Sequence, residues 1–175
     1  VLLAKGKVHG SNSAGMSSAE PVMWPALPTG VVRLYSPAMS ETVRQDTWNL
    51  ADVFEGIARV VPDREAVLDD HQVLTWTQLD RQSNALARHL LVGGAVTGDK
   101  VAIYSYNRAE YTVTLAACFK ARLVPVNINY RYRDEELSYI FDNSDSVAVV
   151  FEAGFGPNLE RLRAGLPKLE QFIQL

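Results

Sequence analysis

The stretch that decides the fold reads VAIYSYNRAEYTVTLAACFKARLVPVNIN, from Val101 to Asn129. It predicts a strand at Val101–Tyr104, a helix at Arg108–Ala121 and a second strand at Val124–Ile128. Both strands are apolar on successive residues, which is typical of parallel strands that are covered on both faces. A strand, a crossover helix and a parallel strand form a right-handed βαβ unit. The sequence therefore predicts an α/β fold built around this unit.

Both ends of the central helix carry recognisable signals. Asn107 is a residue type that caps helices, and Glu110 follows three residues later, where it can bond back to the cap. Glu110 near the start, with Lys120 and Arg122 near the end, also suits the helix dipole. We therefore expect Asn107 to cap this helix.

The elements before this unit are a helix and a hairpin. Asn49 is the expected cap of the helix, and Pro62 is expected to end it. Its apolar residues fall on one face at helical spacing: Leu50, Val53, Phe54, Ile57 and Val61. The segments EAVL (65–68) and VLTW (73–76) are expected to be two short strands joined by residues 69–72.

A second helix is predicted over Trp76–Val92. Its buried stripe is expected to consist of Leu79, Ser83, Leu86 and Leu90. We expect Asp80, Arg81 and Arg88 to face water, and Gly93-Gly94 to end the helix.

The sequence after Asn129 predicts further layers of the same sheet. A loop at Asn129–Tyr132 precedes a helix that starts with Asp134, Glu135 and Glu136. The core face of this helix is expected to be Leu137, Ile140 and Phe141. The remaining expected elements are a strand at Ser146–Phe151, a turn at Gly154–Pro157, a short helix at Asn158–Ala164 and a last strand within Leu169–Leu175. We expect part of a doubly wound, mostly parallel sheet that is incomplete at its C-terminal edge. An exposed strand edge favours self-association.

Residues 1–46 differ in composition from residues 47–175, which we expect to form the globular part. The segments GSNSAG, PALPTG and SPAMS are turn and linker compositions without a sustained period. We expect a disordered extension, and a weak resemblance to a transit peptide is the alternative. Met16, Met23 and Met39 are possible true starts, so part of this stretch can also be translated upstream sequence.

The composition is that of a globular protein, with 47% hydrophobic and 21% charged residues and a net charge of −3. This charge gives no indication of a nucleic-acid partner. Cys118 is the only cysteine, which excludes a disulfide framework and favours a cytoplasmic location. We expect Cys118 to be a core residue rather than a nucleophile.

The segment GGAVTGDK, from Gly93 to Lys100, comes near the pattern of a phosphate-binding loop. Asp99 intervenes before the lysine, however, and no Ser or Thr follows it. A phosphate-binding loop leaves a strand and opens a helix, whereas this segment leaves a helix and opens a strand. We therefore interpret it as a turn.

The other candidate residues suggest no catalytic site, no cofactor site and no metal site. His9, His71 and His89 are isolated, and no cluster with metal-ligand spacing completes them. No Gly-x-Ser-x-Gly segment is present. The tyrosines and arginines of Asn129–Arg133 can form a binding surface at a strand end, or they can simply cover the sheet edge as residues that flank a helix.

From Asn49 onward, the order of motifs resembles one enzyme family. The segments are NLADVFEGIARVVPDREAVL, LTWTQLDRQSNALARHL, TGDKVAIYSYNRAEYTVTLAACFKARLVPVNINYRY and EELSYIFDNSDSVAVVF. Together they are similar to the N-terminal portion of the AMP-forming acyl-CoA ligases, over about 125 residues. The segments VNINYRY and YIFDNSD look most like the fatty-acyl and steroid-side-chain CoA ligases of this superfamily.

The resemblance implies an ATP-dependent fatty-acid–CoA ligase with ATP, Mg and CoA as cofactors in the full-length family. A fatty or sterol carboxylic acid would attack the α-phosphate of ATP, and the thiol of CoA would then displace AMP. The family's phosphate loop and its C-terminal catalytic lysine have no counterpart in this sequence. We therefore expect a truncated N-terminal fragment that is inactive alone; the alternative is a non-catalytic α/β module that binds a ligand or a partner.

Two positions depart from the family's pattern. Arg122 stands where most members have glycine, and Arg133 stands where many have a threonine helix cap.

Overall fold

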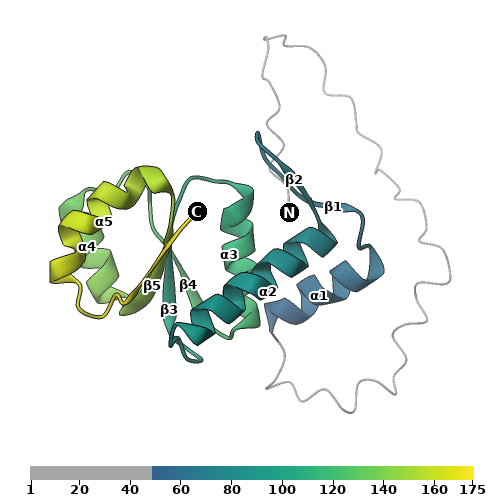
Figure 1. Ribbon diagram of the computed structural model, residues 1–175, viewed down its shortest axis with the longest axis horizontal. Coiled ribbons are helices and arrows are strands. Elements are labelled where there is room, and N and C mark those ends of the chain that lie inside the picture. The colour runs from purple at the N-terminus through teal and green to yellow at the C-terminus, as the bar shows by residue number, and fades with distance from the viewer. Residues whose placement is uncertain (1–48) are drawn as a thin grey trace, which may run out of the picture. The chain divides into compact units, whose positions relative to one another are not determined.

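The computed structural model describes residues 49–175 (Figure 1). The predicted extension at 1–46, with its possible starts at Met16, Met23 and Met39, lies outside these residues. The helices are α1 (Leu50–Val60), α2 (Trp76–Val92), α3 (Ala109–Lys120), α4 (Asp134–Asn143) and α5 (Gly156–Leu162). The strands are β1 (Glu65–Leu68), β2 (Val73–Thr75), β3 (Lys100–Tyr104), β4 (Val124–Asn127), β5 (Ser146–Phe151) and β6 (Gln171–Gln174).

The strands form an antiparallel hairpin, β1–β2, and a parallel sheet in the order β4-β3-β5-β6. The predicted βαβ unit is confirmed, since β3 and β4 are parallel and α3 connects them. From β4 the chain crosses back through α4 to β5, on the other side of β3. This reversal of direction is the pattern of doubly wound α/β proteins.

Helices cover both faces of the parallel sheet, α4 and α5 on one and α2 and α3 on the other (Figure 1). On the α4 side, Tyr104 and Val149 pack with residues that include Phe141. On the α2 and α3 side, Val101 and Val150 belong to the other buried cluster. Because successive residues of β3 and β5 face different cores, both strands are apolar throughout, as the sequence predicts.

Strand β4 does not have the two-sided burial that we expected from its sequence. Val124 remains 46% exposed, and no residue of β4 is fully buried. The reason is its place at the edge of the sheet, where among the described strands it pairs with β3 alone. Pro125 fits this place because proline has no backbone N–H to donate to a second neighbouring strand.

Helix α1 has the predicted cap, but its apolar face is only partly buried. The Asn49 side chain accepts a hydrogen bond from the Ala51 N–H at 2.7 Å, and Asp52 accepts one from the Asn49 N–H at 2.8 Å. Leu50 and Val53, which share the predicted apolar face, are 49% and 39% exposed. Local spacing thus predicts the helix correctly but not how much of it the fold covers.

The predicted bounds of α2 are confirmed, with Thr75 as its cap. Of the predicted buried stripe, Leu86 is only partly buried and packs at the side of the core. Ala87, which we did not predict, is buried instead. The expectation that Asp80 faces water was wrong. Its carboxylate lies 2.6 Å from the Lys120 ammonium, whose side chain is only 6% exposed.

Lys120 joins three helices rather than reaching into solvent. Its ammonium donates to Glu55 of α1 at 3.1 Å, and to Asp80 and Asn84 of α2 at 2.6 and 3.0 Å. All three donors of the ammonium are therefore used within the fold.

The prediction that Asn107 caps α3 was also wrong. The cap position is Arg108, whose side chain makes no capping bond. The N–H of Ala109 instead donates to Asp69 Oδ2 at 2.7 Å, so the cap comes from the hairpin.

Helix α3 ends in the left-handed turn that a glycine would favour, although Arg122 occupies it with φ 59°. The N–H of Leu123 donates to Cys118 O, and that of Arg122 donates to Phe119 O. This pair of bonds is the Schellman motif, in which glycine is the usual residue at the left-handed position.

The C-terminal elements follow the prediction closely. Leu137 and Phe141 of α4 are buried, and the backbone N–H of Arg133 donates to Glu136 at 2.8 Å in place of a threonine cap. The short helix begins at Gly156, two residues earlier than expected, after a 3₁₀ turn at Ala153–Phe155. Within residues 49–175, no helix is long and apolar enough to cross a membrane.

Candidate functional site

The natural place for a site is the carboxyl edge of the parallel sheet, between β3 and β5. The chain leaves β3 for one side and returns to β5 on the other, so the loops after these strands diverge there. Open α/β sheets bind ligands at such a switch point. Ser105 and Tyr106 follow β3, and Glu152 follows β5.

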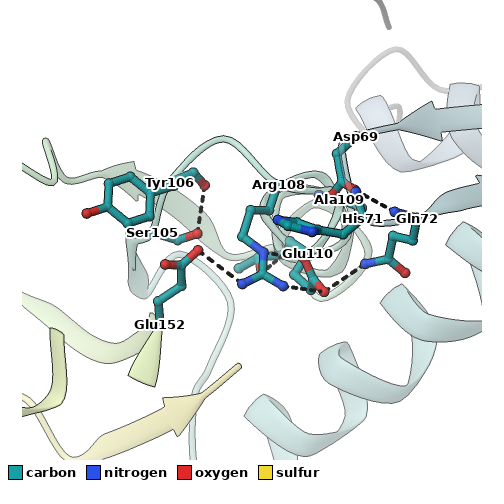
Figure 2. A network of polar contacts seen from close by, with 10 residues as sticks. Asp69, His71, Gln72, Ser105, Tyr106, Arg108, Ala109, Glu110 and Glu152 are labelled. Carbon is teal, nitrogen blue, oxygen red and sulfur yellow. Dashed lines mark hydrogen bonds and ion pairs between the residues drawn. The ribbon is translucent and has the colours of Figure 1, made fainter. Parts of the chain in front are cut away.

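Arg108 spans the switch point, as Figure 2 shows. Its Nη1 lies 3.4 Å from Glu152 Oε1, and its Nη2 lies 3.4 Å from Glu110 Oε1. The Arg108 Nε is 3.2 Å from Glu110 Oε2, but the two atoms lack hydrogen-bond geometry, so their contact is an ion pair. The pKa of Arg108 is raised, chiefly by the charge of Glu110.

The turn of the hairpin closes the other side of this network (Figure 2). Gln72 Nε2 donates to Glu110 Oε1 at 2.7 Å. Asp69 accepts three backbone N–H groups, those of His71, Gln72 and Ala109, each at 2.7 Å. These bonds, with that of Ala109 foremost, lower the pKa of the Asp69 carboxyl. His71 therefore contributes its backbone N–H to this network.

Aromatic side chains line the adjoining part of the same edge. The Tyr106 and Tyr130 rings lie 4.8 Å apart, and Phe155 lies 5.1 Å from Tyr106. The Arg131 guanidinium is 5.4 Å from the centre of the Tyr130 ring. The structure thus brings the Asn129–Arg133 segment to the strand ends. Its role as a binding surface or as edge cover stays a prediction.

The acidic start of α4 lies across an open concavity from α5, lined by Tyr132, Arg133, Asp134, Glu135, Glu136, Asn158 and Arg161. Arg161 holds Asp134 through two bonds, of 3.1 and 2.9 Å. This pairing lowers the pKa of the Asp134 carboxyl. Asn158 donates to the hydroxyl of the buried Tyr104 at 3.1 Å.

The segment GGAVTGDK is a turn between α2 and β3, as its sequence predicts. Gly94 and Gly98 have φ values of 107° and 93°, which only glycine adopts readily. Asp99 accepts the N–H of Val96 at 2.8 Å, and the Gly98 N–H donates to Arg122 O at 2.9 Å. The backbone donors of Val96 and Gly98 are therefore occupied by the protein itself.

Of the remaining candidate residues, Cys118 and His89 lie apart from the switch point. Cys118 is fully buried in α3, and burial raises its pKa to about 12, which fits a core residue. His89 is exposed in the last turn of α2. His9 lies outside the described residues. Within 49–175, no group of three or more His, Cys, Asp or Glu side chains is arranged to hold a metal ion.

The sequence did not reveal the Arg108 network. Arg108, Glu110 and Glu152 are spaced as ordinary surface residues, and 44 positions separate Arg108 from Glu152. The one available signal was the position of Arg108 and Glu152 just after two predicted strands of one parallel sheet.

Comparison with known proteins matches residues 54–173 to the family described as AMP-binding enzyme. The chain belongs to this family. The AMP-binding match begins within α1 and ends within β6, so it covers the whole hairpin and nearly all of the parallel sheet.

Two curated members of the AMP-binding family are similar to the chain over 125 residues. The 3-oxocholest-4-en-26-oate–CoA ligase of Rhodococcus rhodochrous is 38% identical, over 71% of this chain and 22% of the relative. The medium/long-chain-fatty-acid–CoA/3-oxocholest-4-en-26-oate–CoA ligase of Mycobacterium marinum is 37% identical, over 71% and 23%. The chain thus matches less than a quarter of the length of either relative.

One solved structure is similar to the same part of the chain. The N-terminal domain of FACL13 from Mycobacterium tuberculosis superposes with a TM-score of 0.69 and 26% identity, over 73% of this chain and 33% of that domain. The chain therefore matches the N-terminal domain of such ligases, as its motifs predict.

Proposed function

We propose that this chain forms the N-terminal part of an AMP-forming CoA ligase for fatty or sterol carboxylic acids. The observation that carries the proposal is the 38% identity to the 3-oxocholest-4-en-26-oate–CoA ligase of Rhodococcus rhodochrous. The full enzyme would use ATP, Mg and CoA to form an acyl-adenylate and then the CoA thioester. A cytoplasmic location fits these substrates.

The starts of α3 and α4, at the carboxyl edge of the sheet, are poorly suited to the triphosphate of ATP. A triphosphate needs free backbone N–H donors or cationic side chains. At the start of α3, the backbone N–H of Ala109 already donates to the Asp69 carboxylate. The start of α4 carries three acidic residues, Asp134 to Glu136, and the nearby Arg161 is paired with one of them. Both helix starts would therefore repel phosphate.

The contribution of this chain is to build one wall of the enzyme. Arg108 ties the end of β5 to the start of α3, through Glu152 and Glu110. Gln72 and Asp69 tie the hairpin to the same place. These contacts fix the loops at the carboxyl edge, where the rest of the ligase would place ATP and the acid.

The proposal is tested with a fusion in which the part of the Rhodococcus rhodochrous ligase that follows its matched region is joined after Leu175. We expect ATP-dependent formation of CoA thioesters from sterol and fatty acids. The control variant carries Leu137→Asp, which places a charge in the core and should abolish activity. A folded fusion without activity would contradict the proposal and favour a non-catalytic module.

We also propose that the isolated chain self-associates through the free edge of β6. Within residues 49–175, β6 pairs with β5 alone, whereas Pro125 makes the opposite edge, at β4, less suited to further pairing. Light scattering should show a mass that rises with concentration, and Gln174→Lys should reduce the rise. A mass that stays monomeric at every concentration would contradict self-association.

A further inference from the structure

Exposed apolar side chains are concentrated in the first elements of the described chain. Thirteen large hydrophobic residues within 49–175 are exposed, and six of them lie between residues 50 and 73. The six are Leu50, Val53, Val60, Val61, Leu68 and Val73. Four of these belong to α1 and its C-cap.

Helix α1 is apolar over about half of its circumference, counting about 100° per residue. One side of this apolar arc packs against the fold. Ala51 is buried, and the Phe54 ring lies 6.1 Å from both Trp76 and Phe119. The other side carries the four exposed residues, with the partly buried Ile57 between them. We name the four exposed residues the α1 outer face.

The α1 outer face is too apolar for a surface that stays in water. Val60 is 71% exposed, Leu50 49%, Val53 39% and Val61 36%. Clustered apolar side chains of this kind mark an interaction site, whereas single ones need no explanation. Asn49 and Asp52 cap the helix and Lys120 binds Glu55, so α1 has a defined place in the fold. Ala51 is its one fully buried residue, however, so little packing opposes local opening of the helix.

The size of the face argues against a second copy as the partner. A stable protein–protein interface needs roughly 20–30 residues on each side. The α1 outer face offers four residues on a helix of 11. A contact of this size is stable when the two surfaces belong to one polypeptide, because the second contact is then intramolecular.

The relatives are long enough to contain such a second surface within the same polypeptide. The chain matches 22% of the Rhodococcus rhodochrous ligase and 23% of the Mycobacterium marinum ligase. We propose that the α1 outer face is the docking site for an apolar segment from the part of the ligase beyond this match. The inference rests on the proposed function.

The first test measures amide exchange of α1 in the 175-residue chain, at low and at high protein concentration. We expect fast exchange for Leu50–Val61 at both concentrations. Slow exchange at low concentration would mean that residues 1–48 cover the face, and slow exchange at high concentration only would mean that a second copy does. Either result overturns the proposal.

The second test measures the same amides in the fusion described above. We expect exchange of Leu50–Val61 to slow by about tenfold or more, because the docked segment suppresses local opening. An active fusion in which these amides still exchange fast overturns the docking site but leaves the proposed function standing. An inactive fusion overturns the proposed function, and the docking site falls with it.

A matched pair of variants shows whether α1 is the surface involved. Val60→Glu should leave the melting temperature of the 175-residue chain unchanged and lower that of the active fusion. The control is Val92→Glu in α2, a valine that is 89% exposed, which should change neither. Equal effects of the two variants on the fusion, or no effect of Val60→Glu, would overturn the assignment.

Discussion

Asp69 Oδ2 accepts the N–H of Ala109 at 2.7 Å, so the turn of the hairpin caps helix α3. The two residues are 40 positions apart. The same carboxylate holds its own turn through the N–H groups of His71 and Gln72. One side chain therefore fixes the hairpin against the helix that starts at the carboxyl edge of the sheet.

We predict that Asp69→Ala destabilises the fold by about 1 kcal/mol, the usual cost of losing a helix cap. The measurement is the free energy of unfolding in urea. The control is Asp70→Ala, which changes an exposed residue of the same turn and should have little effect. Equal losses for the two variants would contradict the capping role.

The contribution of Asp69 should also depend on pH in one direction. Its pKa is lowered in the fold, so its stabilisation is present above the unfolded pKa of about 3.9 and is lost as the pH falls through the folded pKa. The difference in stability between the wild type and Asp69→Asn should therefore narrow under acidic conditions. A difference that stays constant down to low pH would mean that the charge plays no part.

Gly93 is needed for a close approach rather than for its backbone angle. A Cβ at this position would overlap the Gln171 side chain, which donates to Leu90 O at 3.2 Å. Because the Gln171 side chain is flexible and can move aside, we predict that Gly93→Ala costs about 0.5–1.5 kcal/mol, the net value of the hydrogen bond that is lost. In a Gln171→Ala background, where this bond is already absent, Gly93→Ala should cause no further loss of stability in urea unfolding.

Gly56 provides the matched control for that substitution, because a Cβ at this position would point into open space, with no other part of the fold within 4 Å. Since alanine favours a helix over glycine, Gly56→Ala should stabilise α1 by about 0.5–1 kcal/mol. If both alanine variants change stability alike, the contact with Gln171 is not the cause.

Lys120 and Lys168 make ion pairs of equal length in different surroundings. Each ammonium lies 2.6 Å from a carboxylate, but the Lys120 side chain is 6% exposed and that of Lys168 is 57% exposed. We predict that Lys120→Met costs about 2 kcal/mol, between the values for buried and surface pairs, because Glu55 and Asp80 lose their shared cation. Lys168→Met should have little effect, and similar costs for both would contradict this account.

Arg122 has a left-handed backbone, with φ 59° at the end of α3. Glycine adopts this conformation without the steric cost of a Cβ. We predict that Arg122→Gly stabilises the fold by about 0.5–1 kcal/mol in urea unfolding. A neutral or destabilising result would mean that the contacts of the arginine side chain outweigh the strain of its backbone.

The elements of this fold were largely predictable from the sequence because each carries its own local pattern. The continuous apolar runs of β3 and β5 indicated a parallel sheet, and the bounds of α2 followed from its period and its glycines. Strand β4 was misjudged because an edge strand and a central strand can share one apolar pattern. Their difference depends on strand order, and the one local signal for the edge position was Pro125 within the strand.

The site was less predictable because its contacts join distant parts of the chain. Asn107 offered a plausible local cap, but the carboxylate of Asp69 reaches the helix from the hairpin. Asp80 has the spacing of a solvent-facing residue, yet it binds a buried lysine from α3. Such contacts become visible only when the topology has placed the residues together.

We infer that this chain supplies one wall of a CoA ligase but not its phosphate site. The most direct measurement is ATP–pyrophosphate exchange with fatty and sterol acids, by the 175-residue chain and by its fusion to the remainder of the Rhodococcus rhodochrous ligase. We predict exchange by the fusion and none by the chain alone above a control without protein. Exchange by the purified chain alone, or none by a folded fusion, would contradict the account.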